Sequence, residues 1–330
     1  MIRSSHVGSF PLAYSPDNVK RALKDMARVG LSAPPYPQFR SFIEIYLEPL
    51  LELGVLTRRG GLFYLPEAPE ARRVTGFRVQ EAELAVNYVK EEKLGFRWLR
   101  APVTGVFTLA SRVYVKEPGK TPQGLSATAL SNKELVKGFF VEFVKRAVEY
   151  VSSIGYSIVF LDEPSLTLIV GKKRVLFNYS EEDIVEALDH VAKATSGEVG
   201  VHVCGPLHPR ILEIVAQVPS VKYISVELHD TPQNMDVVDK SLLEKYDKYL
   251  SPGVVSAKKP TVEDVDQVLK LLRAVYEKTA GRVDLVSGDC GFGGLRGSLG
   301  DPELEYSVAV KKLEVVAKAV KQFEERTSGW

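Results

Sequence analysis

Cysteine, methionine and tryptophan are scarce in this chain of 330 residues, which contains two, three and two of them. Two cysteines cannot build a disulfide framework, so we expect a reducing, cytoplasmic environment in which each thiol has its own role. No run of about 18 apolar residues is present, and the first residues have no apolar signal core. These absences argue against a disulfide-rich secreted domain and against a membrane-spanning protein.

Excess charge is also absent. Lysine and arginine number 43 and aspartate and glutamate 42, which gives a net charge of +1. A balanced charge provides no electrostatic reason to expect nucleic acid or a membrane surface as a partner. Hydrophobic residues make up 45% of the chain, enough for one large core. Two domains would be possible at this length, but α/β barrels of this size fold as one.

Apolar, β-branched segments alternate with amphipathic ones along the chain. We predict strands over 2–7, 98–106, 158–161, 199–203, 224–227, 253–256 and 283–287. The stretch 55–65 is ambiguous, because it can form either a hairpin turning at Gly60-Gly61 or an eighth strand. Strands alternating with helices are typical of a parallel sheet covered by helices. Eight such units predict a single-domain (β/α)8 TIM barrel over residues 1–330, with a doubly wound open sheet as the alternative.

Helix-start signals support this alternation. A serine or threonine followed three residues later by a carboxylate is typical of a capped helix start. This pattern occurs at Ser131 with Glu134, at Ser180 with Asp183 and at Thr261 with Asp264. By contrast, residues 107–130 show no clean period, and long irregular connections in compact domains are usually functional or mobile. We predict that this segment is a lid over the site.

The polar residues of greatest interest fall at the carboxyl ends of predicted strands, which converge at the mouth of a barrel. His202 and Cys204 lie two residues apart and therefore share a face of their strand. Glu227 ends a further strand, and Cys290 lies just after another. Imidazole and thiolate are the ligands that zinc prefers, so we predict a zinc site at these four residues. The alternatives are a buried structural cysteine or a redox pair of the two cysteines.

Other strand ends offer groups that could hold a substrate. Asp162, in Asp162-Glu163-Pro164, directly follows a strand and is placed to bind an ammonium group or to transfer a proton. The turn at Gly8-Ser9 could bind a carboxylate through N–H and hydroxyl groups, although an ordinary turn is the alternative. His208 and His229 lie near the predicted mouth and are candidate acids.

Several short motifs occur together in a characteristic order. They are His6-Val7-Gly8-Ser9-Phe10-Pro11, Val103-Thr104-Gly105, Asp162-Glu163-Pro164, His202-Val203-Cys204, Ser225-Val226-Glu227 and Asp289-Cys290-Gly291. In this combination, from the first residues to about residue 300, the chain resembles the catalytic half of cobalamin-independent methionine synthase.

The resemblance implies a (β/α)8 barrel with a catalytic zinc ion bound by His202, Cys204, Glu227 and Cys290. It also implies that homocysteine binds at Val7, Gly8, Ser9 and Asp162 and is methylated on its thiol to give methionine. The alternative enzymes are an alkyltransferase for another thiol and a decarboxylase of the uroporphyrinogen type. The alternative without catalysis is a zinc- or thiol-binding module.

The methyl donor is suggested by two departures from the family. The long form has a second, N-terminal barrel that helps to bind folate, and we expect this chain to lack it. The family's helper histidine is replaced here by Ser256-Ala257-Lys258-Lys259-Pro260. A methyl group on a folate or pterin nitrogen needs a positioned acid, whereas reduced cobalamin departs without a proton. We therefore expect a methyl-corrinoid donor, presented by a partner protein. An N5-methyl folate or pterin, with His229, Asp230 or Lys258 as the acid, is the alternative.

Overall fold

A five-stranded parallel sheet lies at the centre of the fold. The computed structural model describes residues 1–65, 74, 77–115 and 124–327. Its strands are β1 (Thr57–Arg59), β2 (Leu62–Tyr64), β3 (Arg100–Thr104), β4 (Val113–Tyr114), β5 (Ile158–Asp162), β6 (Glu198–Val203), β7 (Tyr223–Glu227) and β8 (Tyr249–Gly253). The central sheet has the order β3-β5-β6-β7-β8. Its register places Thr104, Asp162, His202, Ser225 and Ser251 in one row across the strands.

Three irregular segments close this sheet into a ring. Parallel bridges link β8 to residues 283–287 through Leu250–Val283 and Gly253–Ser287. Further parallel bridges then run from Val286 to Ser4, from Ser5 to Ala33 and from Pro35 to Arg100 of β3. The ring therefore contains eight parallel segments, with residues 4–9 and 33–38 between the last segment and β3. The predicted (β/α)8 barrel is confirmed.

The second segment of the barrel differs from the prediction. Residues 55–65 do not supply it; they form the β1–β2 hairpin of a separate three-stranded sheet with the order β1-β2-β4. The hairpin alternative was therefore the correct one. The barrel segment at 33–38 contains Pro34, Pro35 and Pro37. Proline cannot donate to a strand ladder, so these three residues limit the ladder that this segment can form.

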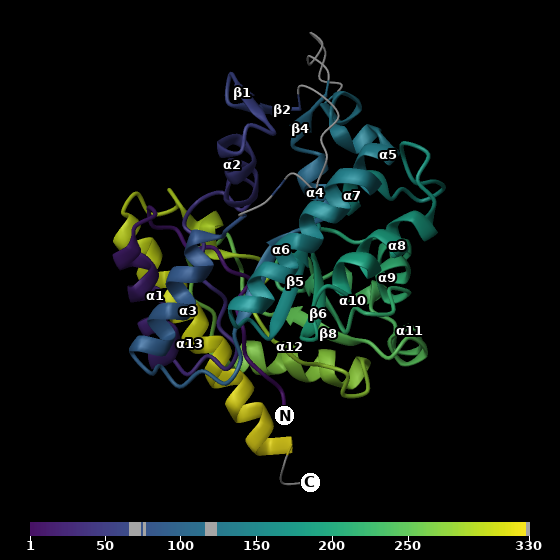
Figure 1. The fold of residues 1–330 in the computed structure, drawn as a ribbon. Helices are drawn as coiled ribbons and strands as arrows, with labels where there is room; N and C mark the ends of the chain where they lie inside the picture. Colours follow the sequence, from purple (N-terminus) through teal and green to yellow (C-terminus); the bar gives the residue numbers. More distant parts are fainter. Residues whose placement is uncertain (66–73, 75–76, 116–123, 328–330) are drawn as a thin grey trace.

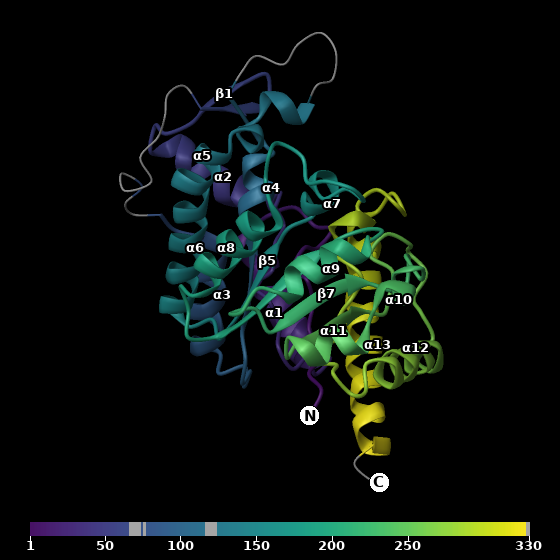
Figure 2. The same ribbon diagram turned by 90° about the vertical axis from the view of Figure 1, so that its right-hand side faces the viewer.

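Helices surround the barrel, as Figures 1 and 2 show. The α-helices are α1 (Pro16–Arg28), α2 (Glu44–Glu52), α3 (Gln80–Glu91), α4 (Val106–Ala110), α5 (Lys133–Leu135), α6 (Val141–Ile154), α7 (Leu166–Ile169), α8 (Glu181–Ala192), α9 (Pro209–Ala216), α10 (Asn234–Val237), α11 (Lys240–Lys245), α12 (Val265–Lys278) and α13 (Pro302–Thr327). A π-helical turn, Val136–Phe140, joins α5 to α6, and 3-10 turns lie at Gly124–Ala127, Ala129–Ser131 and Phe292–Leu295. In the described part of the chain, no helix is long and apolar enough to cross a membrane.

The predicted helix starts are partly confirmed. The capping box of Ser180 and Asp183 is present at α8. The other two predictions were wrong by one and three residues, because Asn132 caps α5 and Asp264 caps α12. Both are residues whose short side chains accept the orphan N–H groups of a first turn.

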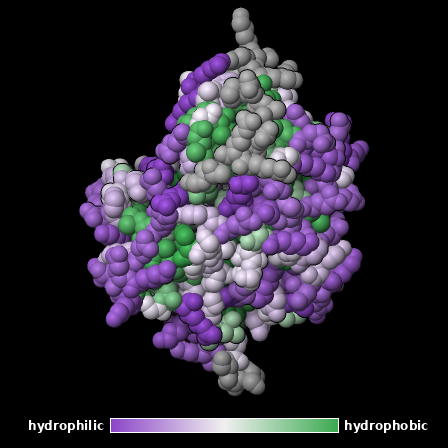
Figure 3. Space-filling view, in the orientation of Figure 1, coloured by the Kyte–Doolittle hydropathy of each residue, from purple (hydrophilic) through white to green (hydrophobic). Residues whose placement is uncertain are grey.

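Two hydrophobic clusters fill the structure. The large one lies between the sheet and the helices, and the small one fills the barrel interior with Ala33, Ile158, Phe160, Tyr223 and Leu285. Hydrophilic side chains cover most of the face drawn in Figure 3, in agreement with a core inside.

The predicted lid is described only in part. Within 107–130, α4 is helical and fully buried, and residues 116–123 lie outside the described residues. Figure 1 places β4 beside β1 and β2, at the end of the molecule away from both termini. The role of this segment as a lid stays a prediction.

Candidate metal and substrate site

An imidazole and two thiols meet at the carboxyl end of the barrel. His202 is the fifth residue of β6, Cys204 directly follows that strand, and Cys290 follows the last barrel segment. Nε2 of His202 lies 3.0 Å from Sγ of Cys204, and the two Sγ atoms are 3.3 Å apart. The ligand atoms of all three residues lie within 4.8 Å of one another. The structure thus brings together three of the four predicted zinc ligands.

The position of Phe160 explains how β6 carries its histidine inside the barrel. A Cβ atom at Gly200 would lie 2.4 Å from the ring of Phe160, so only glycine leaves room for that ring. Two residues later the same face of β6 presents His202. Nδ1 of His202 lies 3.0 Å from the hydroxyl of Ser225 on β7, its neighbour in register. This contact turns Nε2 toward the thiols, as outer partners of metal-binding histidines do.

Glu227 is close to the cluster but not part of it. It ends β7 and is 3% exposed, yet it is not among the atoms that lie within 4.8 Å of one another. Its Oε2 accepts a hydrogen bond of 3.0 Å from the hydroxyl of Thr231. The negative charge of Glu227 contributes to raising the pKa of Cys204, so the carboxylate lies within electrostatic reach.

The two thiols have opposite acidities. The hydrogen bond from Cys204, together with the imidazole of His202, lowers the pKa of Cys290 well below its ordinary value although burial opposes this. The same hydrogen bond and burial raise the pKa of Cys204. The site therefore favours a thiolate at Cys290 over one at Cys204, and thiolate is the form of cysteine that binds metals.

Asp162 lies beside this cluster, at the end of β5. Its side chain is buried, and Oδ1 has no hydrogen-bond partner among the described residues. Burial raises the pKa of Asp162 to about 7, although His202 and Arg100 act in the opposite direction. An unpartnered buried carboxyl can bind a cationic group, and strongly shifted pKa values are typical of functional sites.

Arg100 is a residue that sequence reasoning missed. Its guanidinium is fully buried 3.8 Å from the centre of the Phe160 ring, and its Nη1 donates a hydrogen bond of 3.5 Å to Ser5. Burial lowers its pKa to about 10, so it still carries a positive charge at neutral pH. A lone arginine within an apolar strand was the signal that could have identified it.

Glu163 has a different role from its neighbour. Its carboxyl accepts hydrogen bonds from the N–H of Phe107 at 3.0 Å, from the N–H of Thr108 at 2.9 Å and from the hydroxyl of Thr108 at 2.8 Å. A Cβ atom at Gly105 would lie 2.3 Å from this carboxyl. Glu163 therefore holds the first turn of α4, and the burial that this requires raises its pKa to about 7.

The turn with Val7, Gly8 and Ser9 lies against the loop that follows Cys290. Oγ of Ser9 accepts a hydrogen bond of 3.0 Å from the N–H of Gly293. The backbone carbonyl of Ser9 accepts one of 2.8 Å from the N–H of Phe292. Gly8 has a φ of 149°, and Val7 is buried. The hydroxyl hydrogen of Ser9 remains able to donate.

His229 belongs to a neighbouring group. Its Nδ1 lies 3.3 Å from Asp230 and its Nε2 lies 3.6 Å from Glu263. Its backbone N–H donates a hydrogen bond of 3.0 Å to Asp289, the residue before Cys290. His208, the other candidate acid, caps α9 through a bond from the N–H of Arg210.

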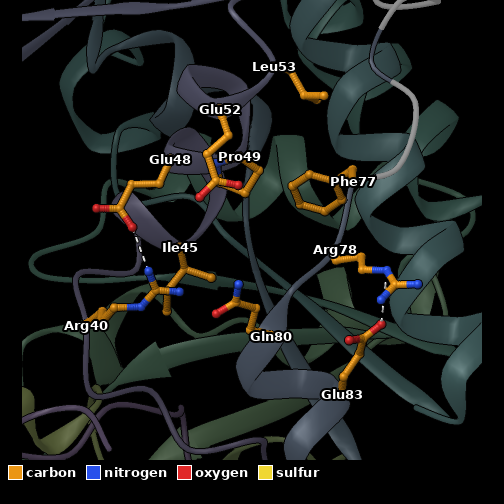
Figure 4. A pocket seen from close by; sticks show the side chains of 10 residues that line it. All are labelled: Arg40, Ile45, Glu48, Pro49, Glu52, Leu53, Phe77, Arg78, Gln80 and Glu83. Atoms are coloured by element: carbon orange, nitrogen blue, oxygen red, sulfur yellow. Dashed lines mark hydrogen bonds and ion pairs between the residues drawn. The ribbon is translucent and has the colours of Figure 1, made fainter.

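A separate cavity lies beside α2 and α3. It has a volume of about 360 Å³, and Figure 4 shows the side chains that line it. Its charges are largely paired, with 2.6 Å between Arg40 and Glu48 and 3.6 Å between Arg78 and Glu83. None of the predicted site residues lines this cavity.

A parallel barrel that gathers imidazole and thiol groups beside a buried carboxyl at its mouth defines a class of barrel protein with a potential metal centre. The comparison with known proteins is more specific. Residues 130–312 match the family model of the catalytic domain of cobalamin-independent synthase. The chain belongs to this family.

Relatives and solved structures agree with that assignment. The methionine synthase of Pyrococcus horikoshii is 22% identical over 236 residues, which cover 70% of this chain and 60% of that protein. A B12-independent methionine synthase from Shewanella, in complex with selenomethionine, superposes with a TM-score of 0.66 at 13% identity and full coverage of both chains. A methyltransferase from Methanosarcina mazei gives 0.63 at 14% identity, over 98% of this chain and 94% of that one. The likeness to these structures shows the barrel fold, and the chain spans about 60% of the curated relatives it matches.

Proposed function

We propose that this chain is a zinc-dependent methyltransferase that methylates the thiol of homocysteine to give methionine. The observation that carries the proposal is the cluster of His202, Cys204 and Cys290 beside the buried carboxyl of Asp162. Membership of the family and the likeness to methionine synthases of Pyrococcus support it.

The donor set fits zinc. Imidazole nitrogen and thiolate sulfur are soft or borderline ligands that select zinc over magnesium or calcium. His202, Cys204 and Cys290 would hold the ion, and Glu227 or the substrate thiol would supply a further ligand. When bound, zinc would lower the pKa of that thiol, so that the substrate reacts as a thiolate near neutral pH.

The remaining groups would hold the amino acid. Asp162 would bind the ammonium group, because its Oδ1 has no other partner and its burial strengthens the ion pair. Ser9 would donate its hydroxyl hydrogen to the substrate carboxylate. In this arrangement the thiol points to the cluster, and its sulfur is presented to the methyl donor.

We propose a methyl-corrinoid as the donor, presented by a partner protein. In that reaction the sulfur–carbon bond forms while the cobalt–carbon bond breaks, the electron pair of the broken bond stays on cobalt, and the proton of the thiol is released to solvent. No acid is needed. The family has its helper histidine in the loop that contains Ser256 in this chain. The hydroxyl of Ser256 donates a hydrogen bond of 2.6 Å to Asp230 and accepts one of 2.9 Å from the N–H of Lys259. His229 would serve as the acid if the donor were instead an N5-methyl folate or pterin.

Metal binding and activity test the site together. Cys204→Ser, Cys290→Ser and His202→Ala should each abolish stoichiometric zinc and methionine formation, because each removes one of three clustered ligands. His190→Ala is the matched control, since His190 pairs with Glu142 on the outer surface and should leave both unchanged. Full activity of zinc-free protein would refute the proposal.

The donor is tested separately. Purified protein with zinc and homocysteine is given methylcobalamin or an N5-methyl pterin, and methionine is measured over time. We expect faster formation from methylcobalamin. Faster formation from the pterin would overturn the corrinoid proposal and leave the thiol methyltransferase intact.

A further inference from the structure

The side chain of Asn234 connects the two loops that carry candidate metal ligands. Asn234 is the first residue of α10 and is 1% exposed. Its Nδ2 donates hydrogen bonds of 3.0 Å to the carbonyl of Gly205 and 2.9 Å to the carbonyl of Glu227. Its Oδ1 accepts a bond of 2.8 Å from the N–H of Leu207. One buried amide thus uses both of its N–H groups and its carbonyl on backbone atoms of the site.

These bonds matter because the loop after Cys204 makes few other hydrogen bonds, although the side chain of Leu207 packs against the hydrophobic core. Gly205 turns the chain with a φ of 79°, and Pro206 has no N–H. Among the described residues, no other hydrogen bond links the backbone of Gly205, Pro206 or Leu207 to the rest of the barrel. The ladder already pairs Val203 with Val226, so the bonds of Asn234 fix the loop that leaves Cys204 rather than the strand that precedes it.

We propose that Asn234 is a positioning residue for the metal centre, which holds the loop of Cys204 against the strand end of Glu227 before any metal binds. The inference rests on the proposed function, because it concerns the zinc site. When the ligand loop is already ordered, metal binding does not have to include the free-energy cost of ordering it. Outer residues that orient metal ligands typically contribute 10- to 100-fold in affinity.

Two variants remove the amide. Asn234→Leu has a similar size but makes no hydrogen bond, and Asn234→Ala removes the side chain. Tyr156→Phe is the matched control, because it deletes one buried hydrogen bond of 2.9 Å to the carbonyl of Ala82, at the opposite end of β5. All three should lower the melting temperature, so melting alone does not distinguish a positioning role from a structural one.

The distinguishing measurement is zinc affinity of the folded full-length chain, determined by competition with a chromophoric chelator. We expect the two Asn234 variants to bind zinc roughly 10- to 100-fold more weakly than the wild type, and Tyr156→Phe to match the wild type. Wild-type affinity in either folded Asn234 variant would overturn the inference and leave the proposed function standing. A wild-type chain that binds no zinc would overturn the proposed function itself.

Hydrogen exchange supplies a readout that needs no variant. The N–H of Leu207 should be protected from exchange in the zinc-free wild-type chain, because it already donates to Asn234. Rapid exchange of this amide without zinc would also overturn the inference, even if neither variant folded.

Discussion

The buried carboxyl of Asp162 predicts that amino-acid binding depends on pH. Burial raises its pKa from 3.8 to about 7. Relative to a free aspartate, the folded chain therefore favours the neutral form of this carboxyl by roughly 4 kcal/mol. About one tenth of the carboxyl is ionised at pH 6 and about nine tenths at pH 8. Only the ionised form can pair with an ammonium group.

The buried carboxyl of Asp162 also makes the stability of the folded chain depend on pH. The folded chain binds this proton more tightly than the unfolded chain, so the contribution of Asp162 is fully present below about pH 4. It is lost as the pH rises to about 7 and stays constant above. An ammonium group that binds the carboxylate opposes this loss, so its affinity should rise about tenfold per pH unit below 7 and level off above.

Methionine is the ligand for the test, because its thioether does not titrate and its ammonium stays charged over this range. Its affinity for zinc-free protein is measured by calorimetry between about pH 5.5 and 8.5. Asp162→Asn should bind weakly and without this pH dependence. In zinc-loaded protein, the pH at which the affinity for methionine levels off should be lower, because a nearby cation favours the carboxylate.

Two results would refute this reasoning. One is equal affinity of the wild type at both ends of the pH range. The other is an Asp162→Asn variant that keeps the slope, since another group would then be responsible.

Two further substitutions test the framework of the site. Glu163→Ala should lower the free energy of unfolding by about 2–5 kcal/mol in chemical denaturation, because two N–H groups and the hydroxyl of Thr108 lose their buried acceptor; a change below about 0.5 kcal/mol would contradict that role. Gly200→Ala should cost about 1–3 kcal/mol or prevent folding, because its Cβ would lie 2.4 Å from Phe160. Adding Phe160→Leu should recover part of that loss. A double variant whose loss of stability equals the sum of the two single losses would argue against the clash.

The sequence predicted the barrel because most of its strand segments are apolar and alternate with helices along the chain. It failed at residues 33–38, where three prolines hide a barrel segment that has almost no ladder. It also allowed residues 55–65 to be the eighth barrel strand, because their β-branched and aromatic residues are equally typical of a barrel strand and of a hairpin. Local patterns of this kind carry no information about which sheet a strand joins.

The site was predictable where residue type alone carries the chemistry. The clustering of His202, Cys204 and Cys290 was predictable, because imidazole and thiol groups at strand ends are rare. Arg100 was missed although a charged residue in an apolar strand was a signal for it, whereas the importance of Asn234 arises only from three-dimensional contacts with two separate loops. No spacing in the sequence encodes such contacts.

The closure of the barrel through Ser4 and Val286 also has a consequence for synthesis of the protein. The N–H of Ser5 donates a hydrogen bond of 2.8 Å to the carbonyl of Val286. The first barrel segment therefore cannot pair with the last one until residues 283–287 have left the ribosome. At about 5–20 residues per second, a chain of this length takes roughly 20–60 s to make. During this time β3, β5, β6, β7 and β8 can pair in order, while the edges of the sheet stay open to other chains. Cys290 follows Cys204 by 86 residues, so the thiol of Cys204 is without its partner for about a quarter of the time that synthesis takes.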